Sequence, residues 1–251
     1  GYRLWHDGIV PGALAAFTGR EERAVAAGSR LGFTVQDISV TGRVETSSAA
    51  VLKALGAGRG TPIFAVDPTA ARTALEALPW VRRASVERRL PDSIRIDLVE
   101  RQPLALWQRD ARFLVIDRDG EEIRGVPAER YPDLLVLVGD DAPAHATALI
   151  RLLSSEPGLR PSIDAAIRVG ARRWNLRLVN GVEIQLPELN PTAAWSRLAA
   201  LESKGKILDG SVRVVDLRLP DQTIVRVARD SAPSAPPESV RGPRLRPPRQ
   251  I

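Results

Sequence analysis

The sequence predicts an α+β protein built from two folded blocks. In the first block, one alternating run is followed by two helix-like segments and two further alternating runs, which predicts a β-α-α-β-β domain. In the second block, Asn-Gly and Pro-Asp pairs separate alternating runs, which predicts a mixed, mostly antiparallel sheet domain with two flanking helices. Hydrophobic residues make up 44% of the 251 residues, enough for one large core or two modest ones.

The first block is expected over residues 33–102. Its opening run, FTVQDISVTG, alternates between two sets of side chains and predicts a strand that ends at Gly42. A short helix should follow, capped by Thr46 or Ser47. Asp67 is the natural N-cap of a second helix, because Pro68 then occupies the first turn, where its missing N–H is not needed.

Two strands joined by Leu-Pro-Asp should complete the first block, over residues 81–89 and 93–101. In the second strand the apolar side chains fall on one face and the charged ones on the other, as expected for a sheet with one buried face. The inward set is Ile94, Ile96 and Leu98, and the outward set is Arg95 and Asp97. Pro103 is expected to end this ladder and begin the hand-over to the second block.

The second block is expected over residues 103–228. Hairpin signals stand in FLVIDRDGEEI, in WNLRLVNGVEIQL and around the Pro-Asp pair of SVRVVDLRLPDQTIVRV. Two helices should interrupt the strands, over residues 142–154 and 191–204, the second capped by Asn190. Asp140 and Asp141 precede the first of these helices, where capping and the helix dipole explain them.

The two ends of the chain differ from these blocks in composition. Residues 1–32 read as a lead-in, helical in part over 20–31. Residues 229–251 hold six prolines and five arginines with few apolar residues, which predicts a disordered tail.

Catalytic, metal and cofactor chemistry finds little support in the sequence. Cysteine is absent, and the two histidines, His6 and His145, stand far apart. The GAGRG segment follows a helix and lacks the Lys-Ser/Thr continuation of a phosphate loop, and DRDG lacks the later ligands of a calcium loop. We therefore expect no catalytic, metal or cofactor-binding residues and no small-molecule substrate.

The net charge of +6 does not by itself indicate nucleic-acid binding. Only three of the 36 basic residues are lysines, a bias typical of genome composition, and aromatic residues are few and scattered. The five tryptophans are too widely spread for a cofactor site, so core packing is the default expectation for them.

Several stretches together resemble one family of bacterial proteins. LPWVRRASVERRLPDSIRIDLVERQPLALW, VQDISVTG and GTPIFAVD resemble the POTRA module of the cell-division proteins FtsQ and DivIB. FLVIDRDG and VVDLRLPDQTIVRV follow in the order of that family's second domain. The resemblance covers residues 33–228, and one POTRA module followed by one sheet domain and a Pro-rich tail makes it specific.

The resemblance implies a role without catalysis. Members of the family are single-pass inner-membrane proteins with this region in the periplasm, and they act at the division septum. They bind FtsB and FtsL and help to localise and regulate septal wall synthesis. We expect the same here, with a transmembrane helix ahead of Gly1. The alternative is a POTRA-containing accessory of outer-membrane protein assembly or secretion, which would need further POTRA repeats or a barrel.

The last strand is the expected partner-binding element. It precedes the tail, so it is expected at a sheet edge, where unpaired backbone groups invite an added strand. In the family the corresponding strand receives a segment of FtsB, which carries the role to Leu219, Asp221, Thr223, Ile224, Val225, Arg226 and Val227. Alternation offers two phases for this strand, and the sequence leaves open which residues turn their backbone groups outward. The aromatic residues common here in the family are absent from this chain.

Overall fold

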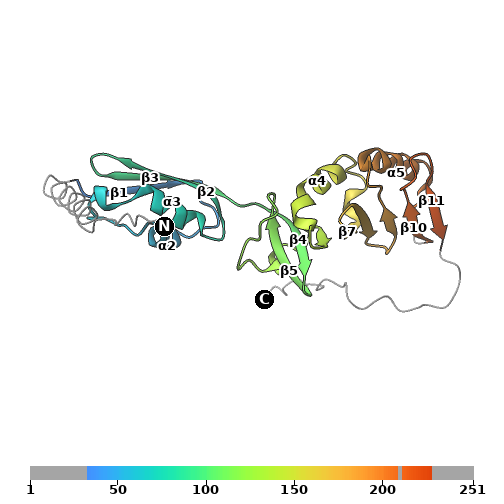
Figure 1. Ribbon diagram of the computed structural model, residues 1–251, viewed down its shortest axis with the longest axis horizontal. Coiled ribbons are helices and arrows are strands. Elements are labelled where there is room, and N and C mark those ends of the chain that lie inside the picture. The colour runs from blue at the N-terminus through green and yellow to red at the C-terminus, as the bar shows by residue number, and fades with distance from the viewer. Residues whose placement is uncertain (1–32, 209–210, 228–251) are drawn as a thin grey trace, which may run out of the picture. The chain divides into compact units, whose positions relative to one another are not determined.

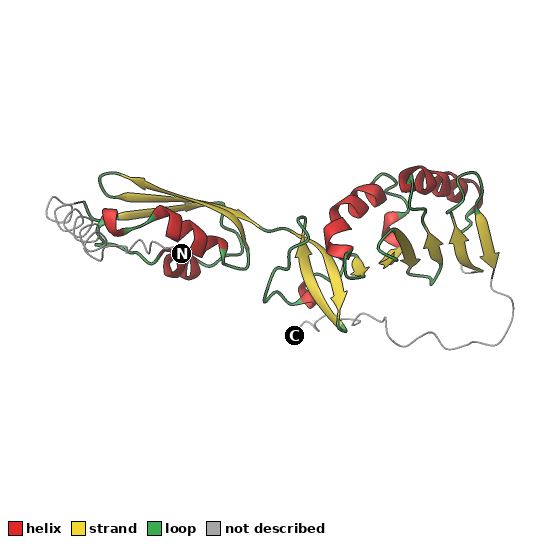
Figure 2. Cartoon of the chain, in the orientation of Figure 1, coloured by secondary structure: helices red, strands yellow, loops and turns green. Residues whose placement is uncertain are grey.

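The computed structural model describes residues 33–208 and 211–227, so the expected lead-in and tail lie outside the described residues. The chain divides into two compact units between Arg101 and Gln102. Figures 1 and 2 show the elements of each unit. The expected α+β class is confirmed, since helices and sheets occur in both units. No helix within these residues is both long and apolar enough to cross a membrane.

The first unit has the predicted β-α-α-β-β order, with both helices on one face of a three-stranded sheet (Figure 1). The sheet order is β1-β3-β2, in which β3 runs parallel to β1 and antiparallel to β2. The elements are β1 (Asp37–Thr41), α2 (Ser48–Leu55), the 3-10 turn η1 (Ile63–Ala65), α3 (Pro68–Glu76), β2 (Val81–Arg89) and β3 (Ser93–Glu100).

Side-chain caps begin both helices of the first unit. The Ser47 hydroxyl accepts a hydrogen bond from the Ala50 N–H at 3.1 Å, which decides between the two predicted caps of α2. The Asp67 carboxylate accepts one from the Thr69 N–H at 2.8 Å, as predicted for α3. Each cap satisfies a backbone N–H that has no partner within the helix.

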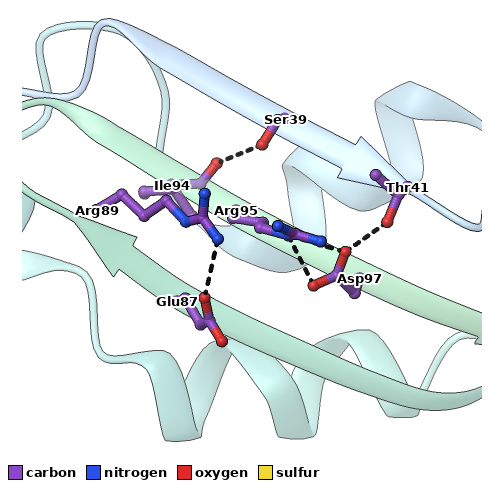
Figure 3. A network of polar contacts seen from close by, with 7 residues as sticks. All are labelled: Ser39, Thr41, Glu87, Arg89, Ile94, Arg95 and Asp97. Atoms are coloured by element: carbon purple, nitrogen blue, oxygen red, sulfur yellow. Dashed lines mark hydrogen bonds and ion pairs between the residues drawn. The ribbon is translucent and has the colours of Figure 1, made fainter.

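The two faces of β3 separate as the alternation predicts. Ile94, Ile96 and Leu98 are buried against the helices. On the other face, the Asp97 carboxylate accepts hydrogen bonds from Arg95 Nε at 2.9 Å and the Thr41 hydroxyl at 2.5 Å (Figure 3). These hydrogen bonds keep the pKa of Asp97 below its usual value, the Thr41 bond contributing most.

Eight strands and two helices make up the described part of the second unit, with strand order β11-β10-β9-β8-β7-β6-β4-β5. Four neighbouring pairs are antiparallel and three are parallel, which matches the predicted mixed, mostly antiparallel sheet. The strands are β4 (Pro103–Arg109), β5 (Arg112–Asp117), β6 (Val136–Val138), β7 (Ile163–Val169), β8 (Arg173–Leu178), β9 (Glu183–Gln185), β10 (Val212–Asp216) and β11 (Ile224–Val227). The helices are α4 (Ala142–Ser154) and α5 (Pro191–Gly205), with 3-10 turns η2 (Ala128–Arg130) and η3 (Arg160–Ser162).

The predicted hairpins form to different extents. The Asn-Gly turn joins β8 to β9, and the Pro-Asp segment joins β10 to β11. After the Asp-Gly turn, however, the returning chain makes only a single bridge, between Ile116 and Glu122. The main partner of β5 is β4, reached through Asp110 and Ala111, whose positive φ angles the sequence did not signal.

One local expectation is wrong, and two others are right for the position of the residue but not for a side-chain cap. Pro103 does not end a ladder, because β3 stops at Glu100 and Pro103 begins β4. Asn190 and Asp141 stand at the N-caps of α5 and α4, but neither side chain caps its helix. Both residues lack the extended backbone that aims a side chain back at the first turn. The Asp141 carboxylate instead accepts a hydrogen bond from Arg168 Nε at 3.0 Å.

The core of the second unit ends one strand short of the edge of its sheet. Trp195 of α5 is fully buried there, with Val212, Val215 and Leu217 at the β10 end. No residue of β11 belongs to this buried cluster. The outermost strand, β11, is therefore held mainly by its pairing with β10 and has little apolar packing of its own.

Candidate functional site

The edge strand β11 combines exposed apolar side chains with backbone groups that no described strand pairs. It lies at one end of the sheet, and among the described residues no strand pairs with its outer side. Ile224, Val225 and Val227 are 41%, 38% and 59% exposed, and Arg226 is exposed as well. An open edge with exposed β-branched residues can take up a further strand.

The seven residues expected to contact a partner fall into two groups. Four of them form β11 itself, whereas Leu219, Asp221 and Thr223 lie in the connection that leads into it. Leu219 and Asp221 are exposed, and Thr223 is half-buried. The structure thus brings the seven residues to one margin of the sheet.

The backbone phase of β11 follows from its neighbours. The Leu217 N–H donates to the Gln185 carbonyl of β9 at 3.0 Å, so Leu217 turns its backbone groups toward β9. Backbone direction alternates along a strand, so Asp216 turns its groups the other way, toward β11. Ile224 lies directly across from Asp216 and turns its groups back toward β10, as Arg226 does two residues later. Val225 therefore directs both its N–H and its C=O away from the sheet.

The side chains of β11 also divide between two faces. Val225 lies across from Val215, which is fully buried in the core beneath the helices, so these two side chains share the helix face. Ile224 and Arg226 lie across from Asp216 and Val214 on the opposite face, called here the open face.

Two arginines hold the connection before β11. Arg197 of α5 donates to the carbonyl oxygens of Pro220, of Leu219 at 3.1 Å and of Leu217 at 3.3 Å. Arg218 binds the Asp216 carboxylate through two nitrogens, at 2.6 and 2.8 Å. The Arg218 hydrogen bond outweighs burial and keeps the pKa of Asp216 below its usual value.

A positively charged pocket of about 700 Å³ adjoins this connection. The arginines that line it are Arg172, Arg173, Arg197 and Arg218, beside one carboxylate, that of Glu188. The Nε atoms of Arg173 and Arg197 are buried and have no hydrogen-bond partner among the described residues. The sequence did not signal this pocket, because its arginines come from distant segments that only the fold brings together.

The remaining candidates have structural explanations. Residues 56–60 form a loop rather than a phosphate cradle at the start of a helix. The Asp117 carboxylate of DRDG accepts from the Asp119 and Glu121 N–H groups at 2.9 and 3.0 Å, as in an ordinary turn. His145 is half-exposed, with its Nε2 at 3.4 Å from Asp141. Within residues 33–208 and 211–227, no three potential ligands gather to hold a metal ion.

Family models match both units. Residues 33–101 match the POTRA domain of the FtsQ type. Residues 105–218 match the C-terminal region of the cell-division proteins FtsQ and DivIB, so β11 lies just beyond the matched part.

Relatives that align with most of the chain are cell division proteins named FtsQ. The chain is 35% identical over 205 residues to the cell division protein FtsQ of Caulobacter vibrioides, covering 82% of this chain and 68% of that protein. It is 34% identical to the FtsQ of Rickettsia conorii, covering 76% and 71% of the two chains. It is also 34% identical to the FtsQ of Agrobacterium fabrum, covering 81% of this chain but only 64% of that protein.

Proposed function

The chain belongs to the FtsQ/DivIB family of bacterial cell-division proteins, and from this premise we propose that it is a non-enzymatic scaffold of the division machinery. In this role it binds partners of the FtsB and FtsL type and helps to localise and regulate septal wall synthesis. A single transmembrane helix ahead of Gly1 would hold it in the inner membrane, with both units in the periplasm.

The observation that carries the proposal is the open edge of β11. Its outward N–H and C=O groups belong to Val225, and its side chains are exposed on both faces. A partner segment can add there as a further strand, gaining backbone hydrogen bonds for affinity and side-chain contacts for selectivity.

The arginine-lined pocket supports a partner segment with negative charge. It lies against Leu217, Arg218 and Pro220, at the start of the connection to β11. Arg172 and Arg218 have carboxylate partners, but no carboxylate pairs with Arg173 or Arg197 among the described residues. Charge complementarity of this kind speeds association and discriminates between partners.

The phase of β11 makes the proposal testable with single prolines. Val225→Pro removes an outward N–H and places a ring where the added strand would lie, while the bonds to β10 remain. We expect binding to the extracytoplasmic segment of the native FtsB-type partner to weaken about 100-fold, with a nearly unchanged melting temperature. Calorimetric titration and circular dichroism measure the two quantities.

Ile224→Pro is the matched control, one residue away. It removes an N–H that points toward β10, so we expect it to lower the melting temperature of the second unit instead. If the Val225→Pro protein binds the partner as tightly as the unchanged chain, β11 is not the docking edge.

A further inference from the structure

We propose that Arg226 selects the partner strand by its charge, requiring an acidic side chain directly across from it on the open face. On the helix face, beside Val225 and Val227, the same strand then presents apolar side chains. This inference rests on the proposed function, since it concerns the strand that β11 would receive. The partner is thus defined by its pattern, an extended segment in which acidic and apolar residues alternate.

Arg226 has no direct ion pair in the described part of the chain, although the charge of Asp216 lies near enough to interact with it. Its side chain is exposed. It makes no hydrogen bond or ion pair with a described residue. Its direct neighbour across the ladder is Val214, which offers no charge. The nearby Asp216 carboxylate is already bound by two nitrogens of Arg218, so its field reaches Arg226 but its oxygens are engaged.

The backbone phase brings the side chain of Arg226 close to an added strand. Its N–H and C=O point toward β10, so on the outer side Arg226 occupies a non-hydrogen-bonded position of an antiparallel pair. The Cα atoms of such a pair are only about 4.5 Å apart, and their side chains approach more closely than those of a hydrogen-bonded pair. A glutamate or aspartate at that position can reach the guanidinium.

The surroundings of Arg226 also favour an acid. Arg213 is exposed on the neighbouring strand β10, and the arginine-lined pocket adjoins the connection before β11. Of the pocket arginines, Arg218 is already paired with Asp216. A basic side chain on the added strand would face this positive field, whereas an acidic one would be attracted to it.

On the helix face, apolar rather than acidic side chains of an added strand would fit. Val225 continues the row of the buried Val215, and Val227 lies across from the buried Val212. The apolar core therefore stops at β10, and these two valines stay 38% and 59% exposed. Apolar side chains on an added strand would extend that core by one row and cover both valines.

Charge variants of Arg226 test the inference against the extracytoplasmic segment of the native FtsB-type partner. In Arg226→Glu the attraction becomes a repulsion, and we expect the dissociation constant to rise at least tenfold at about 0.05 M salt. The difference should shrink at about 0.5 M salt, because ions screen exposed charges. Arg226→Lys should bind within about threefold of the unchanged chain.

Arg83→Glu is the control, since it makes the same charge change on the exposed edge strand β2 of the first unit and should leave binding unchanged. The matching acid-to-arginine change on the partner should restore binding to the Arg226→Glu protein. Normal binding by Arg226→Glu, combined with loss of binding in Val225→Pro, would overturn charge selection and leave the docking edge in place. Normal binding by both variants would instead show that β11 is not the docking edge.

Discussion

Among the four edge strands of the described residues, two have opposite character, β2 in the first unit and β11 in the second. β2 is nine residues long and exposes charged side chains, among them Arg83, Glu87 and Arg89. One of its outward N–H groups, that of Ala84, donates to the Glu76 carboxylate of α3 at 3.1 Å. β11 is only four residues long and exposes Ile224, Val225 and Val227 instead.

The difference shows how one chain closes some sheet edges and leaves another open. Charges on β2 penalise an added strand, and Glu76 occupies a backbone group that a strand would need. The β5 edge is covered as well, because the Ile123 N–H donates to the Val115 carbonyl at 2.8 Å. Of these three edges, β11 has the least protection and the most apolar exposure. This openness is what the proposed docking of a partner strand requires.

The largest loss of stability is expected when the core that ends at β10, next to the open edge β11, is disrupted. Trp195 is fully buried in the core that ends at β10, so Trp195→Ala should destabilise the second unit by about 3–5 kcal/mol. Denaturant unfolding followed by amide NMR would report each unit separately. Signals from β2 should keep their original midpoint, and a joint shift of both units would contradict independent folding.

A smaller effect is expected where β11 begins. Asp216 lies across from Ile224 and binds Arg218, so Asp216→Asn should cost about 1 kcal/mol at neutral pH, the exposed guanidinium limiting the gain. The pKa of Asp216 is lower in the folded protein than the ordinary 3.8, so its contribution is full above that pH and is lost as the pH falls through the folded pKa.

The pH dependence of the melting temperature checks this prediction. The unchanged chain should lose stability relative to Asp216→Asn as the pH drops below about 4. Asp221→Asn removes an exposed carboxylate of the same connection and serves as the control. Parallel curves for Asp216→Asn and the unchanged chain would show that the Arg218 contact does not hold the edge.

The smallest change in stability is expected when the exposed charges that protect the β2 edge are removed. Replacing Arg83, Glu87 and Arg89 together by threonine should leave the melting temperature within about two degrees, since all three are exposed. It should nevertheless promote self-association through β2, visible by sedimentation velocity, because the charges that oppose pairing are gone. A protein that stays monomeric would mean that Glu76 alone protects this edge.

Local signals in the sequence were sufficient for most of the first unit. Asp67 with Pro68 marks a helix start through groups only two residues apart, and the alternation of β3 reports its buried face directly. β6 was missed because it has only three residues and pairs in parallel with β4 and β7. β7 was missed although it pairs with its neighbour β8, because the turn between them, with Gly170 and Ala171 at positive φ, lacks the Asn-Gly type of signal. The β4–β5 turn was missed because its residues, Asp110 and Ala111, are not the Asn-Gly type that signals such turns.

The sequence by itself determined the family resemblance, the order of most elements and the candidate edge strand. It could not determine which residues of β11 face outward, since an alternating pattern reads equally well in either phase. Only the tertiary structure decided that, through the bond from Leu217 to Gln185, which sets the direction of β10 and hence of β11. The arginine-lined pocket likewise exists only after folding, because long-range pairing, not local chemistry, brings its side chains together.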